Sequence, residues 1–153
     1  MFKLSKKSTL SVLAFVLGSM LTAVQANEPA LAYSHDDKTL QWGPCPAFIG
    51  KGCEISVLHG DPAKNNLDIL FKVPSGFSIP HHWHTSAERM VLVSGKMKVT
   101  YDNQKSETLE FGTYAYGPSK RPHTAYCDNG DTCDLFIAID VPLAAFEVLN
   151  APR

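Results

Sequence analysis

The feature that most constrains the fold is a regular alternation of short apolar runs with turn-forming residues between residues 55 and 149. The runs are rich in β-branched, aromatic and aliphatic residues, and turn signals such as Pro74-Ser75-Gly76 and Asn129-Gly130 recur about every eight to twelve residues. No sustained helical period follows residue 26. The pattern predicts an all-β sandwich or barrel with strands at 55–58, 67–73, 77–83, 88–93, 97–101, 108–111, 114–116, 124–127, 135–140 and 146–149.

Residues 1–26 have the features of a secretory signal peptide. Three lysines near the start precede an apolar run over 10–24, and the run ends in Val24-Gln25-Ala26, which suits cleavage after Ala26. A permanent anchor is the weaker interpretation, because the run is shorter than the roughly 20 apolar residues that span a bilayer. We therefore expect a periplasmic or secreted protein with no stable membrane insertion after signal cleavage.

The remaining 127 of the 153 residues are enough for one domain with a continuous core. Residues 27–54 contain three prolines and are predicted to form an irregular extension that wraps the barrel of residues 55–150. The signal segment holds three lysines and no acidic residue, so its removal changes the formal charge from −1 to −4. A mildly acidic surface does not attract phosphate backbones, and no nucleic-acid partner is expected.

All four cysteines follow the predicted cleavage site, in two pairs that are close in sequence. In an oxidising compartment this arrangement favours disulfides, and the pairing Cys45–Cys53 and Cys127–Cys133 closes two short loops. Buried free thiols are an alternative, whereas a four-thiolate zinc site would need tighter spacing. If Asn129-Gly130 is the turn of a hairpin, Cys127 faces Cys133 only when the loop has an odd number of residues.

Residues 76–95 concentrate the side chains that bind metals, in the sequence GFSIPHHWHTSAERMVLVSG. Residues two apart on a strand point to the same face, so His82 and His84 project together, while His81 and Trp83 project the other way. Glu88 follows a short connection and opens the next strand, so it can bring a carboxylate back toward the two imidazoles.

A third imidazole, His123, ends a second segment that begins at Gly112. Three neutral histidines and one carboxylate suit Mn, Fe, Co, Ni, Cu or Zn, and they suit Ca or Mg poorly. The sequence predicts a site for one divalent transition metal ion, whose identity is open among those six, with the ligands His82, His84, Glu88 and His123.

The two segments resemble the two conserved motifs of the cupin superfamily. The first motif, G(X)5HXH(X)3–4E(X)6G, matches at every specified position: Gly76, His82, His84, Glu88 and Gly95. The second motif, G(X)5PXG(X)2H(X)3N, matches at Gly112, Pro118 and His123. Lys120 replaces its second glycine and Cys127 replaces its asparagine.

Sixteen residues separate the motifs, as in bacterial single-domain cupins. The resemblance implies a double-stranded β-helix, a jelly-roll barrel with the metal inside it near one mouth and the four residues named above as ligands. Cupins are often dimers, so the resemblance also implies a homodimer as one possible state of this protein.

Five residues are candidates for a pocket beside the metal. Arg121 could bind an anionic substrate through its guanidinium, although a solvated turn residue is the plainer interpretation. Met90 and Leu92 share the face of Glu88 by strand alternation. Tyr116 could offer a phenol and Phe136 a wall, yet aromatic residues in barrel strands are usually packing residues.

The leading functional hypothesis is a metal-dependent oxidoreductase of the dioxygenase type that acts on a small organic molecule. Four protein ligands leave one or two coordination positions for oxygen, water or substrate. The alternative is a non-catalytic cupin that binds or senses a metal or small ligand in the bacterial envelope. An accessible cavity beside the metal would favour the enzyme, whereas a barrel filled by side chains would favour the alternative.

Overall fold

The computed structural model describes residues 28–149, so the predicted signal peptide lies outside the described residues. The chain divides into two units, Met1–Leu31 and Ala32–Arg153, and the fold described below belongs to the second. Regular structure within the described residues is entirely strand. No helix in this part of the chain is long and apolar enough to cross a membrane.

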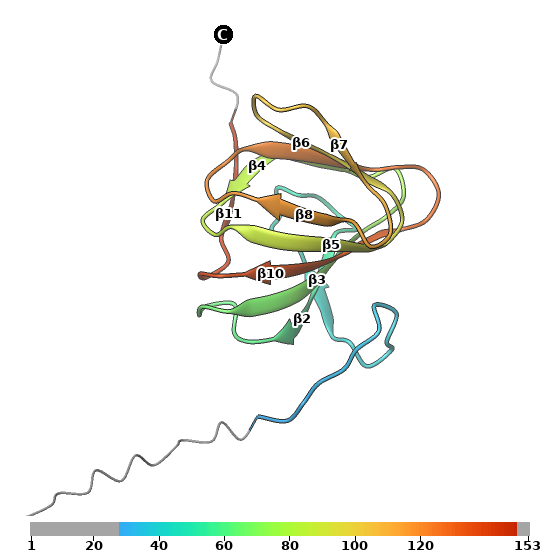
Figure 1. Cartoon of the computed structure of the whole chain (residues 1–153), viewed down its shortest axis with the longest axis vertical. Coiled ribbons are helices and arrows are strands. Elements are labelled where there is room, and N and C mark those ends of the chain that lie inside the picture. The colour runs from blue at the N-terminus through green and yellow to red at the C-terminus, as the bar shows by residue number, and fades with distance from the viewer. Residues whose placement is uncertain (1–27, 150–153) are drawn as a thin grey trace, which may run out of the picture. The chain divides into compact units, whose positions relative to one another are not determined.

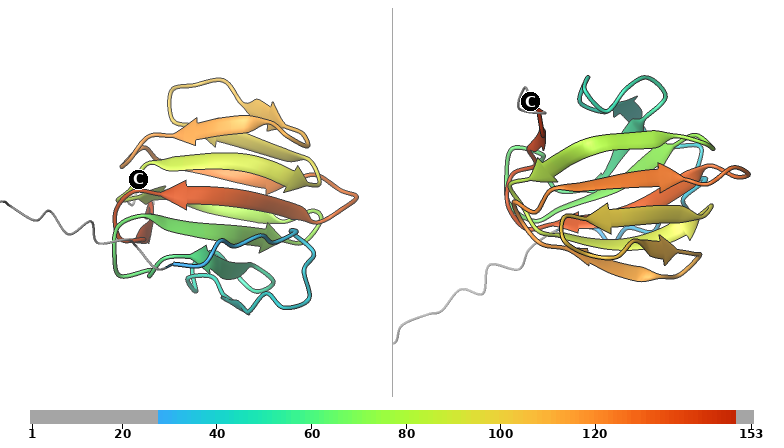
Figure 2. Two further views of the ribbon diagram at one scale, coloured as in Figure 1. Left: turned by 60° about the horizontal axis from the view of Figure 1, so that its bottom comes forward. Right: turned by 90° about the horizontal axis from the view of Figure 1, so that it is seen from above.

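Two antiparallel sheets build the barrel (Figures 1 and 2). The first sheet has the order β1 (Trp42–Pro44), β2 (Glu54–His59), β3 (Leu67–Val73), β10 (Cys133–Ile139), β5 (Glu88–Ser94) and β8 (Tyr114–Gly117). The second has the order β11 (Ala145–Glu147), β4 (Ser78–His84), β9 (His123–Cys127), β6 (Met97–Tyr101) and β7 (Glu107–Leu109). Strands far apart in sequence lie side by side, as β3 and β10 do in Figure 1.

The all-β jelly-roll prediction is confirmed, and each predicted strand region contains an observed strand. The N-terminal extension differs from the expectation of a wholly irregular segment. Residues 42–44 pair with β2, in the register Trp42 to Ser56, and the Lys72 ammonium lies 4.1 Å from the centroid of the Trp42 ring. Three residues are too few to show a period in the sequence, so this edge strand is visible only through its pairing.

The core lies between the two sheets and follows strand alternation. In β5 the side chains of Glu88, Met90 and Leu92 are buried, whereas their neighbours Arg89 and Val91 are only partly covered. The largest fully buried side chains, which come from both sheets, are those of Leu67, Leu92, Met97, Ile139 and Val73. Burial of this apolar surface is the main favourable contribution to folding.

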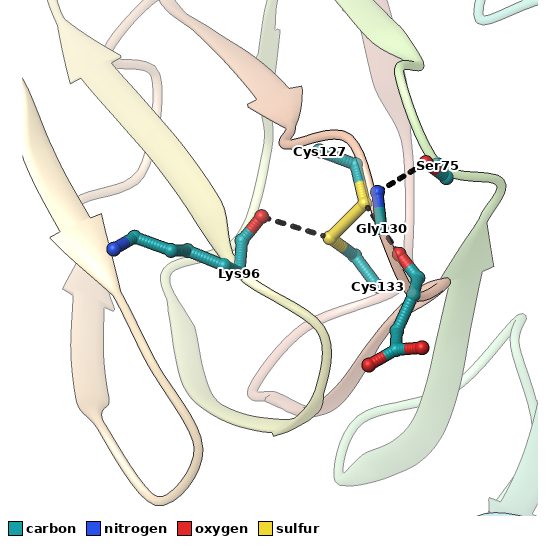
Figure 3. Close-up of a disulfide and its surroundings, with 6 residues drawn as sticks. Ser75, Lys96, Cys127, Gly130 and Cys133 are labelled. Carbon is teal, nitrogen blue, oxygen red and sulfur yellow. Dashed lines mark hydrogen bonds between the residues drawn. A yellow bond between two sulfur atoms is a disulfide. The ribbon is translucent and has the colours of Figure 1, made fainter.

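Two disulfides are present, Cys45–Cys53 in the extension and Cys127–Cys133 in the barrel. The loop 128–132 has an odd number of residues, but β9 and β10 do not pair with each other. They belong to different sheets, so the hairpin condition inferred from Asn129-Gly130 does not apply. Instead, the Cys127–Cys133 bond joins the second sheet to the first (Figure 3).

The surroundings of this disulfide explain a glycine of the first motif. A side chain at Gly95, whose φ is +74°, would collide with the carbonyl oxygen of Thr132. The same loop is held from another side, because the Gly130 amide donates a hydrogen bond of 2.8 Å to Ser75 Oγ (Figure 3). Close backbone approach at a positive φ is what glycine permits.

Removal of the inter-sheet disulfide is expected to cost about 2 kcal/mol, the loop-closure entropy that a cross-link of this span removes from the unfolded chain. The test is urea unfolding of the double variant Cys127→Ala/Cys133→Ala. Ser75→Ala, which weakens the same loop and keeps the disulfide, is the control, with an expected loss of about 1 kcal/mol. Equal losses in the two variants would show that the loop, and not the cross-link, carries the effect.

Candidate metal centre

Three histidines come together on the inner face of the second sheet. The register of β4 and β9 pairs His82 with His123, so their side chains point to the same side. His84 lies two residues after His82 and shares its face. The ring centroid of His82 lies 4.7 Å from that of His84 and 4.3 Å from that of His123. One ring nitrogen from each of the three histidines lies within 4.8 Å of the other two.

Backbone carbonyl groups orient two of these rings. His82 Nδ1 lies 2.7 Å from the carbonyl oxygen of Pro80, and His123 Nδ1 lies 3.2 Å from that of Arg121. Since a carbonyl oxygen only accepts, each Nδ1 is the protonated nitrogen and each Nε2 keeps its lone pair. This is the arrangement in which metal-binding histidines are held in proteins.

Burial keeps the imidazoles neutral. It lowers the pKa of His82, and it lowers the pKa of His84 to about 3 and that of His123 to about 4, with a smaller contribution from the neighbouring imidazoles. Cationic imidazolium cannot bind a metal, so the lowered pKa values leave the three rings available as neutral nitrogen donors.

Glu88 faces the histidines from the first sheet. Its side chain is almost fully buried, and Oε1 lies 3.4 Å from His84 Nε2. Burial raises the pKa of this carboxyl to about 8. A buried carboxylate needs a compensating positive charge, and a divalent cation among three neutral imidazoles would supply one.

The donor set therefore fits a divalent transition metal ion. Three imidazole nitrogens and an adjacent carboxylate have the chemistry that such ions prefer. In addition, His84 Nδ1 and Tyr101 Oη are buried without a hydrogen-bond partner among the described residues. Both rings lie beside that of His123, with centroid distances of 5.5 and 4.7 Å. Buried polar atoms without a partner call for one that the chain does not itself provide.

A cavity of about 180 Å³ lies against this cluster. Apart from the four predicted ligands and Tyr101, the residues that line it are apolar, and they include Ile69, Phe71, Ile79, Met90 and Val99. Pro46 and Ile49 of the N-terminal extension complete the wall. An apolar cavity of about 150 Å³ is known to hold benzene, so this one accommodates a molecule of about one six-membered ring.

Of the five residues predicted to form the pocket, one lines the cavity and four do not. Met90 lines the cavity, whereas Leu92, on the same face, is fully buried outside the cavity lining. Phe136 is absent from the lining because its two β10 neighbours point inward. Tyr116 is also absent, since alternation along β8 leaves its side chain 54% exposed.

Arg121 likewise does not line the cavity, because its guanidinium donates a hydrogen bond of 3.0 Å to the carbonyl oxygen of Asp102. Its neighbour Lys120, which stands in the place of the motif's glycine, has a φ of +59°. The Lys120 amide donates a hydrogen bond of 2.8 Å to the carbonyl oxygen of His84. The glycine-type turn is therefore kept with a lysine, at the steric cost of a left-handed backbone.

Tyr101 is a site residue that the sequence analysis missed. It lines the cavity, and its ring centroid lies 4.7 Å from that of His123. Burial raises the pKa of its phenol well above the usual value, so the hydroxyl keeps its proton. The signal was present in β6, where Met97 and Val99 are buried and Tyr101 follows on the same face.

Residues 32–140 match the model of the ChrR cupin-like domain family. The chain belongs to this family. The resemblance to cupins inferred from the two motifs is thereby confirmed. No curated protein sequence matches the chain.

Solved structures share the fold of this ChrR-like cupin. The polyketide cyclase RemF from Streptomyces resistomycificus has a TM-score of 0.67 and 18% identity, over 81% of this chain and 88% of that one. The DMSP lyase DddQ from Ruegeria pomeroyi DSS-3 has a TM-score of 0.60 and 18% identity, over 71% and 60%. Oxalate decarboxylase from Bacillus subtilis has a TM-score of 0.55 and 19% identity, over 64% and 28%.

Proposed function

We propose that this cupin is a metal-dependent enzyme of the bacterial envelope, an oxidoreductase of the dioxygenase type that acts on a small organic molecule. The observation that carries the proposal is the cavity of about 180 Å³ in direct contact with the three imidazoles and Glu88. A site that served only to hold a structural metal would have no need of a ligand-sized space beside it.

His82, His84, His123 and Glu88 would hold the ion, the first three as neutral donors and the last as the balancing charge. When bound, the ion supplies Lewis acidity or oxygen activation at the positions that the protein leaves open. The chain's own contribution is to fix the imidazoles through the carbonyl groups of Pro80 and Arg121. The apolar wall binds the carbon body of a substrate and excludes bulk water.

Solved structures with a similar fold support the general proposal that this protein is an enzyme that acts on small molecules. A polyketide cyclase, a DMSP lyase and an oxalate decarboxylase all carry this fold. Because their named activities differ, the oxidative reaction proposed here rests on the open coordination positions and on fold-level analogy. The envelope location is supported by the predicted signal peptide and by the two disulfides, which persist in oxidising compartments.

The second candidate function is a non-catalytic binding or sensing module. It is favoured because the cavity contains few groups that could transfer a proton. Among the described residues that line the cavity, Tyr101 is the single hydrogen-bonding side chain besides the four predicted ligands. A module that only holds a small ligand beside a metal needs no further proton-transfer group.

Metal analysis of protein isolated from its native compartment, followed by oxygen-electrode assays, tests both functions. Catechols, thiols and keto acids are offered to the metal-loaded protein, with His123→Ala as the control. Oxygen uptake that requires His123 supports the oxidoreductase. Tight binding of one of these compounds without turnover supports the binding module, and protein that takes up no transition metal contradicts both.

A further inference from the structure

We propose that Tyr101 is the hydrogen-bond donor of this site, and that its hydroxyl binds an anionic oxygen of a small ligand whose body is apolar. The inference deepens the proposed function and rests on the metal site described above. It adds a residue that neither motif contains, and it assigns a chemical class to the ligand.

Tyr101 belongs to the same row of side chains as the histidines. The register of β6 and β9 pairs Tyr101 with His123, and that of β9 and β4 pairs His123 with His82. Directly opposed residues of antiparallel strands project to the same face. The three side chains therefore lie across three adjacent strands and face the cavity, which all three help to line.

The hydroxyl of Tyr101 has no partner among the described residues, although it is buried. A buried donor without an acceptor is unfavourable, and such groups in native proteins call for a partner that the protein chain does not itself provide. Because the residue lines the cavity, an acceptor atom of a ligand in that space would satisfy it.

Gly117 makes room for this hydroxyl. The register of β5 and β8 places Gly117 opposite Glu88, on the sheet that faces Tyr101. A Cβ atom at Gly117 would collide with Tyr101 Oη and would lie 3.4 Å from Glu88 Oε2. Gly117 has no positive φ, so its backbone does not require glycine. The reason for glycine here is the space occupied by the Tyr101 hydroxyl beside the Glu88 carboxyl.

The ligand class follows from these contacts and from the size of the cavity. The polar groups that could meet a ligand are a bound metal, whose open position can take an oxygen donor, and the Tyr101 phenol, whose hydrogen bond is strongest to an anionic oxygen. The rest of the lining is apolar, and the volume of about 180 Å³ limits the body to about one six-membered ring. A monocyclic phenolate or carboxylate satisfies all three conditions.

The test uses the full mature protein loaded with Co²⁺, with catechol and benzoate as probes in calorimetric titrations. For Tyr101→Phe we expect an unchanged Co²⁺ affinity and a probe affinity lowered about tenfold or more, the usual effect of losing a hydrogen bond to a charged group. Tyr114→Phe, which removes a hydroxyl from an exposed position of β8, is the matched control and should bind the probes as the wild type does.

Gly117→Ala keeps the hydroxyl but displaces it, so we expect the same loss of probe affinity at an unchanged Co²⁺ affinity, with thermal unfolding as the check on folding. Wild-type probe binding in folded Tyr101→Phe would overturn the proposal. A fall in Co²⁺ affinity in that variant would also overturn it, because the hydroxyl would then serve the metal ligands. Co²⁺-loaded wild type that binds neither probe would refute the ligand class, whereas wild type that binds no Co²⁺ would refute the proposed function itself.

Discussion

Replacement of His82 or His123 by alanine is expected to lower the affinity for Co²⁺, Ni²⁺ or Zn²⁺ by more than about a hundredfold. Loss of a residue that only orients a ligand already costs about ten- to a hundredfold, and loss of the ligand itself costs more. The rise in Tm on metal addition should disappear with it, because a bound ion stabilises only the folded state. Calorimetric titration and thermal unfolding, with and without a chelator, measure both effects.

His81→Ala is the matched control for this experiment. His81 is the immediate neighbour of His82, but its side chain projects from the opposite face of β4. Its Nε2 lies 2.9 Å from Asp102 Oδ1. Its replacement should leave the metal affinity unchanged. Metal affinities that are equal in the wild type, His81→Ala and His82→Ala would show that the three buried imidazoles are not the metal site.

Metal-free wild-type protein is expected to lose stability as the pH rises from about 6.5 to above 8, and Glu88→Gln to lose none over that range. Burial raises the pKa of Glu88 to about 8, above its ordinary value of 4.5. The folded state thus holds a proton that the unfolded state has released, and this contribution is lost as the pH rises through 8. A shift of this size corresponds to several kcal/mol, at about 1.4 kcal/mol per pKa unit.

The histidines act in the opposite direction at lower pH. Their folded pKa values, about 3 for His84 and about 4 for His123, lie below the ordinary value of 6.5. The unfolded state therefore binds more protons between about pH 4 and 6.5, and stability increases with pH across that interval. Together the two effects give the metal-free wild type a stability maximum near pH 6.5, whereas Glu88→Gln should rise to a plateau.

Urea unfolding in chelator between pH 5 and 9 distinguishes these curves. Glu107→Gln, at an exposed position of β7, is the control and should follow the wild type. Metal should abolish the high-pH decline of the wild type, because the ion replaces the proton as the charge that balances the carboxylate. A decline in Glu88→Gln as steep as in the wild type would mean that Glu88 is not its source.

The local arrangement of the site could be predicted from the sequence. Alternation along a strand is a property of the backbone. The common face of His82 and His84, the opposite face of His81, and the shared face of Glu88 and Met90 therefore follow from spacing alone. The glycines of the two motifs likewise predict turns with a positive φ, as Gly76, Gly95 and Gly112 have. The turn at residue 120 keeps its left-handed backbone even though lysine occupies it.

Alternation does not say which face is inner, or how far along the barrel a residue lies. The sequence predicts Phe136 and Tyr116 at the pocket, yet the faces that carry them point away from it. Leu92 has the predicted face but is fully buried outside the cavity lining. These outcomes depend on how the two sheets pack, and so on contacts between residues distant in the sequence.

The amino-acid sequence is enough to predict an all-β barrel of short strands, in which two segments present three imidazoles and a carboxylate. The tertiary structure was needed to show that β9 and β10 lie in different sheets, so that Cys127–Cys133 joins those sheets. It alone placed Tyr101 against Gly117. Local backbone geometry sets the direction of each side chain within a strand, whereas the pairing of strands is set by the burial of apolar surface over the whole domain.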